Sequence, residues 1–202
     1  MVWYEDEVRL LEAKTKTIDP TADRVVFYGS SSIRLWTTLA NDFPQINTLN
    51  LGFGGSTLAA CTWFFDRLVV PVNPKSIVFY AGDNDLGDGR HPEEVCLFFC
   101  ALADRMRQQL PDTSLSFLTI KLSPARWGIG DKIRATNRLI TDEVRKNPLF
   151  QTIDMTSPLL GGDGRPRREL FEADGLHLNS AGYQVWKQVL EESQIFNNLF
   201  TY

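Results

Sequence analysis

Short apolar segments alternate along this chain with longer segments in which apolar residues recur at helical spacing. The short segments have the length and the β-branched and aromatic content of buried strands. In the longer segments, apolar positions three or four residues apart indicate amphipathic helices. Strands are therefore predicted at Val25–Tyr28, Ile46–Asn50, Ser76–Tyr80, Leu115–Ile120 and Phe150–Ile153.

Helices are predicted between these strands and toward both ends of the chain. The first lies within about residues 1–16, where Trp3 to Lys14 is amphipathic and Val8 and Leu11 share the face expected to pack on the domain. The others run over Ile33–Leu39, over Leu58–Leu68, from Pro92 (with Val95, Phe98, Leu102 and Met106 inward), from Asp131 (with Ile133, Ile140 and Val144 inward) and from Ser180 (with Trp186, Val189 and Leu190 inward).

Strands that alternate with helices predict βαβ units with right-handed crossovers and a parallel sheet. The 202 residues show no repeat or linker and suit one domain, residues 1–202, that buries most of its apolar surface. We expect an α/β fold with a central parallel sheet of five strands.

Composition narrows the possible partners and the location. The net charge is −4 and no Lys/Arg cluster stands out, so nucleic acids and anionic membranes are poor partners. No apolar run approaches the 18 residues or so of a membrane-spanning helix. The acidic residues near the N-terminus do not resemble a signal peptide, and a cytoplasmic location is expected.

Metal binding is not expected. Cys96 and Cys100 share a face of a predicted helix, but no histidine or further cysteine lies near them in sequence, so buried free thiols are the better interpretation. The aspartates at 83, 85 and 88 superficially suggest a calcium loop, but Gly87 and Asp88 stand where an EF-hand needs an oxygen ligand and then a glycine.

Polar loops follow the first three predicted strands, and in a parallel sheet these loops meet at one edge. The first loop carries the hydroxyls of Ser30, Ser31 and Ser32 at a strand-to-helix turn, where helix amides point the same way. Capping of the following helix is the alternative role for these serines. The other two loops are Gly52–Ser56, which lacks the complete glycine pattern of a phosphate-binding loop, and Gly82–Asp85.

His177 is the candidate catalytic base. It follows Asp174 by three residues, a separation at which the carboxylate can accept a hydrogen bond from one ring nitrogen in a turn. Ser31 is the candidate nucleophile, with His177 as its base and later the acid for the leaving group. The only other histidine, His91, precedes a predicted helix and suits a solvated turn.

Three groups are candidates to stabilise an oxyanion: the Ser31 amide, a glycine amide of Gly54–Gly55 and the Asn84 side chain. Glycine suits such a loop because its backbone takes positive φ and approaches a substrate closely.

Together these segments resemble the four sequence blocks of the SGNH (GDSL-type) hydrolases, in the same order. The blocks are Gly29-Ser30-Ser31, Gly52 to Thr57, Gly82 to Asp85 and Asp174 to His177. The resemblance implies a flavodoxin-like three-layer α/β/α sandwich and an esterase, lipase or thioesterase activity that needs no cofactor.

By this resemblance Ser31 is the nucleophile, Gly55 and Asn84 are oxyanion donors, and Asp174 and His177 complete the triad. Two positions depart from the family pattern: Ser30 replaces the usual aspartate, and Leu178 stands where proline is frequent. The first departure leaves Ser30 and Ser32 as alternatives to Ser31. An α/β-hydrolase is disfavoured because the second glycine of G-x-S-x-G is missing.

Side chains in or beside the loops are candidates to shape the substrate pocket, with surface packing as the alternative role. They are Arg34, Phe53, Asp88, Arg126, Trp127 and Phe171. Asn50, at the end of the second strand, is expected to brace the loops by hydrogen bonds. Trp3 and Tyr4, or Phe196 to Tyr202, either seal the core or meet a second subunit, so a homo-oligomer is an open expectation.

The sequence thus predicts a serine esterase that acts on a small or medium carboxylic ester. The compact domain without an apolar lid favours an acetyl or short-chain acyl group, on a carbohydrate or a lipid. The alternatives are a flavodoxin-like module that binds phosphate or flavin at the same edge, and a non-catalytic interaction module.

Overall fold

In the computed structural model, which describes residues 1–193, five parallel strands form one sheet in the order β2-β1-β3-β4-β5. In β1, Val25 faces Thr48 of β2 and Ser76 of β3. The chain passes from β1 to the edge strand β2 and returns to β3, so the crossovers reverse direction beside the carboxyl ends of β1 and β3. Ligands of open α/β sheets bind at such a point. The strands are β1 (Val25–Gly29), β2 (Thr48–Gly52), β3 (Ser76–Tyr80), β4 (Ser114–Leu118) and β5 (Phe150–Ile153).

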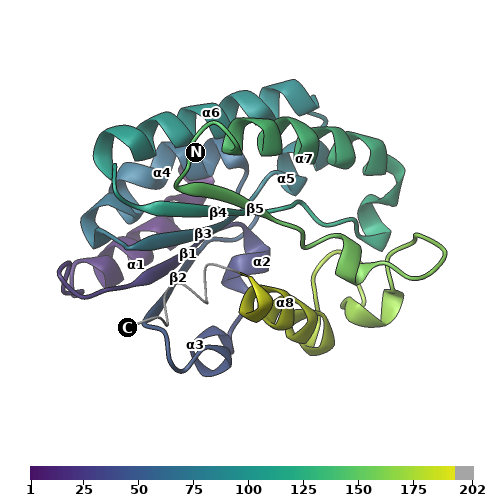
Figure 1. The fold of residues 1–202 in the computed structure, drawn as a ribbon, viewed down its shortest axis with the longest axis horizontal. Coiled ribbons are helices and arrows are strands. Elements are labelled where there is room, and N and C mark those ends of the chain that lie inside the picture. The colour runs from purple at the N-terminus through teal and green to yellow at the C-terminus, as the bar shows by residue number, and fades with distance from the viewer. Residues whose placement is uncertain (194–202) are drawn as a thin grey trace.

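Helices cover both faces of the sheet (Figure 1). Alternate residues of β1 divide between two hydrophobic cores: Val26 and Tyr28 belong to one, Val25 and Phe27 to the other. The fold is therefore the flavodoxin-like α/β/α sandwich expected from the sequence. The first core lies under α1 (Glu5–Thr15), α4 (Leu58–Leu68), α6 (Pro92–Gln109) and α7 (Gly130–Val144), and the second under α2 (Ser31–Arg34), α3 (Leu39–Asp42) and α8 (Ser180–Glu192).

The region after β1 differs from the expectation of one helix over Ile33–Leu39. It contains two short helices, α2 and α3, with an irregular stretch between them. The stretch turns Trp36 into the second core, where its indole N–H donates to Asp42 at 2.7 Å. Strand β2 also begins two residues later than predicted, because Ile46 closes a turn by donating to the Phe43 carbonyl.

The inward face of α6 is centred on Phe99 and not on the predicted Phe98. Phe99 is fully buried and its ring meets Phe117 of β4 edge-on, with 5.5 Å between centroids. Phe98 is half-buried, and the Arg90 guanidinium lies over its ring. Val95 and Phe99 are both buried and lie four residues apart, so the buried face of α6 follows a spacing of four residues at this point and not three.

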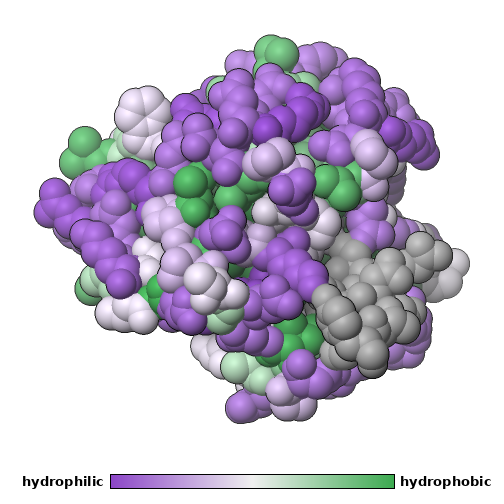
Figure 2. Space-filling view, turned by 60° about the vertical axis from the view of Figure 1, so that its left-hand side comes forward, coloured by the Kyte–Doolittle hydropathy of each residue, from purple (hydrophilic) through white to green (hydrophobic). Residues whose placement is uncertain are grey.

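Helix α1 contacts the first core through the fully buried Val8. Before it, in the short 3-10 helix Val2–Tyr4, Tyr4 is buried and Trp3 is exposed. Figure 2 shows a face on which hydrophobic residues are scattered among hydrophilic ones, as on ordinary protein surfaces. None of the helices within residues 1–193 is long and apolar enough to cross a membrane. The C-terminal residues 196–202, for which a sealing or subunit contact was expected, lie outside the described part.

Candidate active site

The turn after β1 places a serine at the edge of the sheet. Gly29 has a φ of +143°, and a Cβ at this position would lie 1.9 Å from the Tyr80 carbonyl oxygen, so only glycine permits the approach of β1 to β3. The next amide, of Ser30, donates to that carbonyl at 2.9 Å. Ser31 then begins α2.

Of the three consecutive serines, Ser31 is the one that faces the histidine. Its Oγ lies 2.9 Å from Nε2 of His177. Ser30 is fully buried, and its Oγ has no hydrogen-bond partner within residues 1–193. Ser32 is also buried, and its Oγ accepts a hydrogen bond from Lys121. Ser31 therefore has the geometry expected of a nucleophile, and its two neighbours do not.

His177 in turn contacts Asp174, with 2.6 Å between Nδ1 and Oδ2. When Nδ1 carries the proton and donates to this carboxylate, Nε2 is left to accept from the Ser31 hydroxyl. The second oxygen of Asp174 accepts from the amides of Leu176 and His177 at 2.8 and 3.1 Å. The Leu176 amide and the His177 side chain lower the pKa of Asp174 to about 2. The carboxylate is therefore ionised at neutral pH.

The loop that carries Asp174 and His177 is held by local hydrogen bonds. The Arg168 guanidinium donates to the carbonyls of Glu172 and Ala173 at 2.6 and 2.8 Å. The Glu172 amide donates to the His177 carbonyl at 2.8 Å, which closes the loop on itself. The sequence pattern predicts no regular secondary structure for this segment, and it did not indicate that Arg168 holds the loop.

The loop after β2 leaves one of its two candidate amides available. The Gly54 N–H donates to the carboxylate of Glu7 in α1 at 2.8 Å. None of the hydrogen bonds within the described chain uses the Gly55 N–H. Gly55 has a φ of +65°, and its carbonyl accepts from the Tyr4 hydroxyl at 3.0 Å. Gly55, not Gly54, is thus the residue whose amide is open to a ligand.

Asn84 lies beside this loop, in the short helix α5 (Asp83–Gly87) that follows β3. Its Nδ2 donates to the Ser56 carbonyl at 3.1 Å, which joins α5 to the residue after Gly55. Asp85, fully buried, accepts the Leu58 amide at the start of α4 at 2.7 Å. Burial raises the pKa of Asp85. These bonds fix α5 and the Gly55 loop relative to each other.

Asn50 braces the same edge, as expected. Its Nδ2 donates to the Ile33 carbonyl in α2 at 2.6 Å, and its Oδ1 accepts the Gly52 amide at 2.9 Å. The end of β2 is thereby bonded to the helix that carries Ser31.

A buried polar network beneath Ser31 was not found from the sequence. Lys121 is 1% exposed, and its Nζ lies 3.3 Å from the Asp83 carboxylate. The same ammonium donates to the Tyr80 hydroxyl and to Ser32 Oγ, each at 3.1 Å. The available signal was one lysine inside an otherwise mostly apolar stretch, Leu115–Leu122.

Two of the expected pocket residues lie in the hydrophobic cores instead. Phe53 is fully buried in the first core, where its ring meets Tyr4 and Phe64 edge-on at 5.5 and 5.9 Å. Phe171 is 4% exposed and belongs to the second core. Both residues flank polar loops, but their rings turn inward because the sheet and α8 offer apolar surface there.

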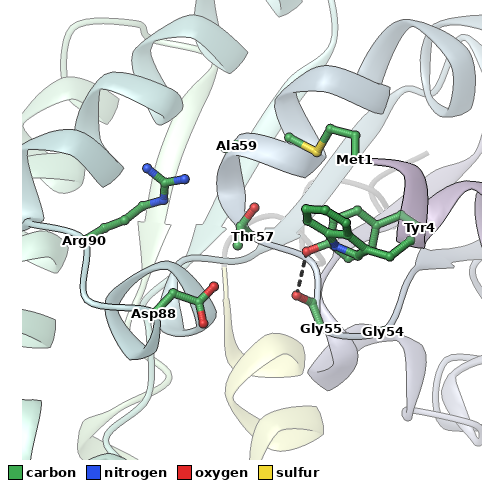
Figure 3. A pocket seen from close by; sticks show the side chains of 9 residues that line it. Met1, Tyr4, Gly54, Gly55, Thr57, Ala59, Asp88 and Arg90 are labelled. Carbon is green, nitrogen blue, oxygen red and sulfur yellow. Dashed lines mark hydrogen bonds between the residues drawn. The ribbon is translucent and has the colours of Figure 1, made fainter.

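The polar pocket candidates lie at different places. Arg34 is paired with Glu7 at 3.6 Å and lines a cavity along β2 that contains none of the proposed catalytic residues. Asp88 lines another cavity, of about 610 Å³, beside Gly55 (Figure 3). In Figure 3, Tyr4 and Gly55 bound this hollow on one side and Asp88 on the other.

The last two candidates, Arg126 and Trp127, lie in the 3-10 helix η3 (Pro124–Ile129) between β4 and α7. Trp127 is 36% exposed. The guanidinium groups of Arg134 and Arg165 lie over it, 5.8 and 5.7 Å from the ring centroid. The tryptophan is thus held at the surface by two cations.

The fold resembles several solved structures. A GDSL-like lipase from Bacteroides thetaiotaomicron superposes with a TM-score of 0.80 at 17% identity, over 96% of this chain and 98% of that chain. A carbohydrate esterase of family 3 from Talaromyces cellulolyticus gives 0.70 at 16% identity, over 90% and 100% of the two chains. The OSK domain of Drosophila Oskar gives 0.67 at 18% identity, over 88% and 93%.

A search of curated protein sequences finds no match to this chain. The GDSL-like Lipase/Acylhydrolase family, in contrast, matches residues 22–185, a range that includes all four sequence blocks. The resemblance noted from the sequence is therefore confirmed, and the chain belongs to the GDSL-like Lipase/Acylhydrolase family of ester-bond hydrolases.

Proposed function

We propose that this protein is a serine esterase that hydrolyses small or medium carboxylic esters through an acyl-enzyme. One observation carries the proposal: the hydrogen-bonded row from Ser31 through His177 to Asp174, with separations of 2.9 and 2.6 Å. The proposed roles are nucleophile, general base and orienting carboxylate, in that order.

In the acylation step, the Ser31 oxygen attacks the ester carbonyl carbon while its proton passes to Nε2 of His177. Asp174, ionised at neutral pH, stabilises the imidazolium that forms. The tetrahedral intermediate then collapses, and the imidazolium gives its proton to the departing alcohol oxygen. In deacylation, a water molecule attacks the acyl-enzyme, His177 accepts the proton of the water, and Ser31 leaves with that proton as the acid is released.

The negative oxygen of each tetrahedral intermediate needs donors that are already in place. The proposed donors are the amides of Ser31 and Gly55 and the side-chain amide of Asn84. The open Gly55 N–H and the bond from Asn84 to Ser56 support this assignment. Removing one such donor raises the barrier by about 3 kcal/mol in other hydrolases.

An acetyl or other short acyl group is the proposed acyl half of the substrate, and a carbohydrate is the proposed alcohol half. The similarity in fold to a carbohydrate esterase supports this choice. So does the mixed lining of the cavity beside Gly55, which combines Trp3 and Tyr4 with Asp88 and Arg90. Sugars present both an apolar ring face and hydroxyls to such a surface.

The test is hydrolysis of p-nitrophenyl esters from acetate to palmitate by the wild type and Ser31→Ala in parallel. We expect activity that falls with chain length and is lost in the variant. A variant that keeps most of the activity would overturn the role of Ser31. The flavodoxin-like binding alternative predicts bound flavin in the absorbance spectrum, or stabilisation by a nucleotide, with no ester hydrolysis.

A further inference from the structure

Arg126 is a partly buried cation without an anionic partner in the described chain. Its Nε is buried and has no hydrogen-bond acceptor, and no carboxylate of residues 1–193 pairs with its guanidinium. Neighbouring arginines are engaged: Arg134 pairs with Asp131 at 3.0 Å, and Arg168 binds loop carbonyls. A guanidinium is always protonated, so burying part of it without a partner is costly.

The position of Arg126 joins the two halves of the proposed site. The preceding amide, of Ala125, donates to the Gly175 carbonyl at 3.0 Å, in the turn between the proposed acid and base. The guanidinium lies against Gly87, where an added Cβ would be 2.3 Å from its central carbon. Gly87 ends α5, the helix that carries Asn84. Arg126 therefore lies between the loop that carries Asp174 and His177 and the helix that carries Asn84.

Two further guanidinium groups lie over the residue that follows Arg126, although the chain is acidic overall. Trp127 follows Arg126 in η3 and is covered by the guanidinium groups of Arg134 and Arg165. Asp88 follows Gly87, the residue against which the Arg126 guanidinium lies. Its carboxylate lines the cavity beside Gly55 and forms no ion pair with Arg126. Arg134 is paired with Asp131, but neither Arg126 nor Arg165 forms an ion pair within residues 1–193, and guanidinium groups of this kind attract anions.

We propose that Arg126 forms an anion subsite of the esterase, so that the preferred substrate is an ester that also carries a carboxylate or a phosphate. A planar guanidinium binds either group through two parallel N–H···O bonds. The charged group takes no part in the bond changes at Ser31; it holds the ester in place. This inference rests on the proposed function, and it leaves open whether the charge sits on the acyl or the alcohol half.

The test uses two matched pairs of esters. For the acyl half, the mono-p-nitrophenyl ester of adipate, whose carboxylate is too far along the chain to attack its own ester readily, is compared with p-nitrophenyl hexanoate; for the alcohol half, 4-acetoxybenzoate is compared with its methyl ester. We expect kcat/KM of the wild type to favour the anionic member of one pair by about tenfold or more, the usual size of one charge-assisted hydrogen bond. The pair that shows the preference identifies the half that carries the charge.

Variants then assign the preference to Arg126. Arg126→Gln is expected to remove the preference for the anionic ester, mainly through KM, and Arg126→Lys to keep part of that preference. Arg145→Gln is the matched control: it removes the same charge from the opposite edge of the sheet, where Arg145 is paired with Asp142. Equal rates within both pairs, or a preference that survives in Arg126→Gln, would overturn the subsite.

A binding measurement separates this outcome from failure of the proposed function. Calorimetry with succinate and with uncharged succinamide needs no catalysis. If the wild type hydrolyses none of the four esters but binds succinate in an Arg126-dependent manner, the esterase proposal fails and the anion subsite stands. If it hydrolyses the neutral esters and neither binds succinate nor favours an anionic ester, the subsite fails and the esterase stands. If it shows neither hydrolysis nor binding, both fail.

Discussion

The two halves of the proposed triad are positioned by different means. Ser31 is supported by buried residues: Ser30, Ser32 and Lys121 are each at most 1% exposed. The side chains of Asp174 and His177, by contrast, are 47% and 25% exposed. Packing and a buried ion pair thus hold the nucleophile, whereas short-range hydrogen bonds within one loop hold the base and the acid.

The difference teaches that stability and activity can be separated in this site. A substitution beneath Ser31 disturbs the cores on which the whole fold depends, because buried charges are costly when left unpaired. A substitution in the Asp174–His177 loop changes groups that water already reaches, and folding is affected little. The following changes test this contrast.

Asp174→Asn is expected to have the largest effect, and to have it on activity alone. The amide cannot stabilise the imidazolium and favours the wrong tautomer of His177, so kcat should fall by about 10⁴-fold, as for comparable triads. The free energy of unfolding in urea should change little. Glu172→Gln, a neighbouring exposed carboxylate, serves as the control and should retain activity. Comparable losses in the two variants would show that Asp174 has no special role.

Lys121→Met is expected to reduce stability most. It leaves the Asp83 carboxylate buried without its cation, which typically costs about 3–5 kcal/mol in the free energy of unfolding. Adding Asp83→Asn should recover part of this loss, because no charge then remains buried. Lys187→Met removes a surface partner of Glu191 and should cost at most about 1 kcal/mol. If urea unfolding gives the same small loss for Lys121→Met and Lys187→Met, the buried pair does not support the nucleophile.

The smallest effect concerns the acid dependence of stability. Asp174 has a pKa of about 2 in the folded chain against an ordinary value of 3.8, so below pH 3.8 the unfolded chain binds more protons. Its contribution is therefore present above pH 4 and is lost as the pH falls through about 2. Solvent screening of this half-exposed group keeps the contribution small. The difference in unfolding free energy between the wild type and Asp174→Asn should shrink between pH 5 and pH 2; a constant difference would contradict the shift.

The sequence could suggest Ser31, Asp174 and His177 as candidates because their signals are local: a hydroxyl at a strand-to-helix turn, and an aspartate three residues before a histidine. The network of Lys121, Asp83 and Ser32 was not predicted, because it joins three segments that are far apart in sequence. No local pattern shows which of their residues come into contact. The alternation of strands and helices determined the sheet and its edge in the same local way.

Other features depended on contacts over long sequence distances. The resemblance to the family favoured Gly55 over Gly54, but the contact that occupies the Gly54 amide comes from Glu7, 47 residues earlier in the chain. Phe53 and Phe171 were assigned to the pocket because they flank loops, but position beside a loop does not show which way a ring faces. The cavity beside Gly55 is lined in part by Met1, Trp3 and Tyr4. The sequence predicted that the N-terminal helix packs on the domain, but not that the residues before it lie beside Gly55.

The central claim, that Ser31 is the nucleophile, is tested most directly by labelling the wild type and Ser31→Ala with a fluorophosphonate and mapping the adduct by mass spectrometry. We expect one adduct per chain, on Ser31, with loss of ester hydrolysis in proportion to labelling and no adduct in the variant. An adduct on Ser30 or Ser32, or an active protein that is not labelled, would contradict the account.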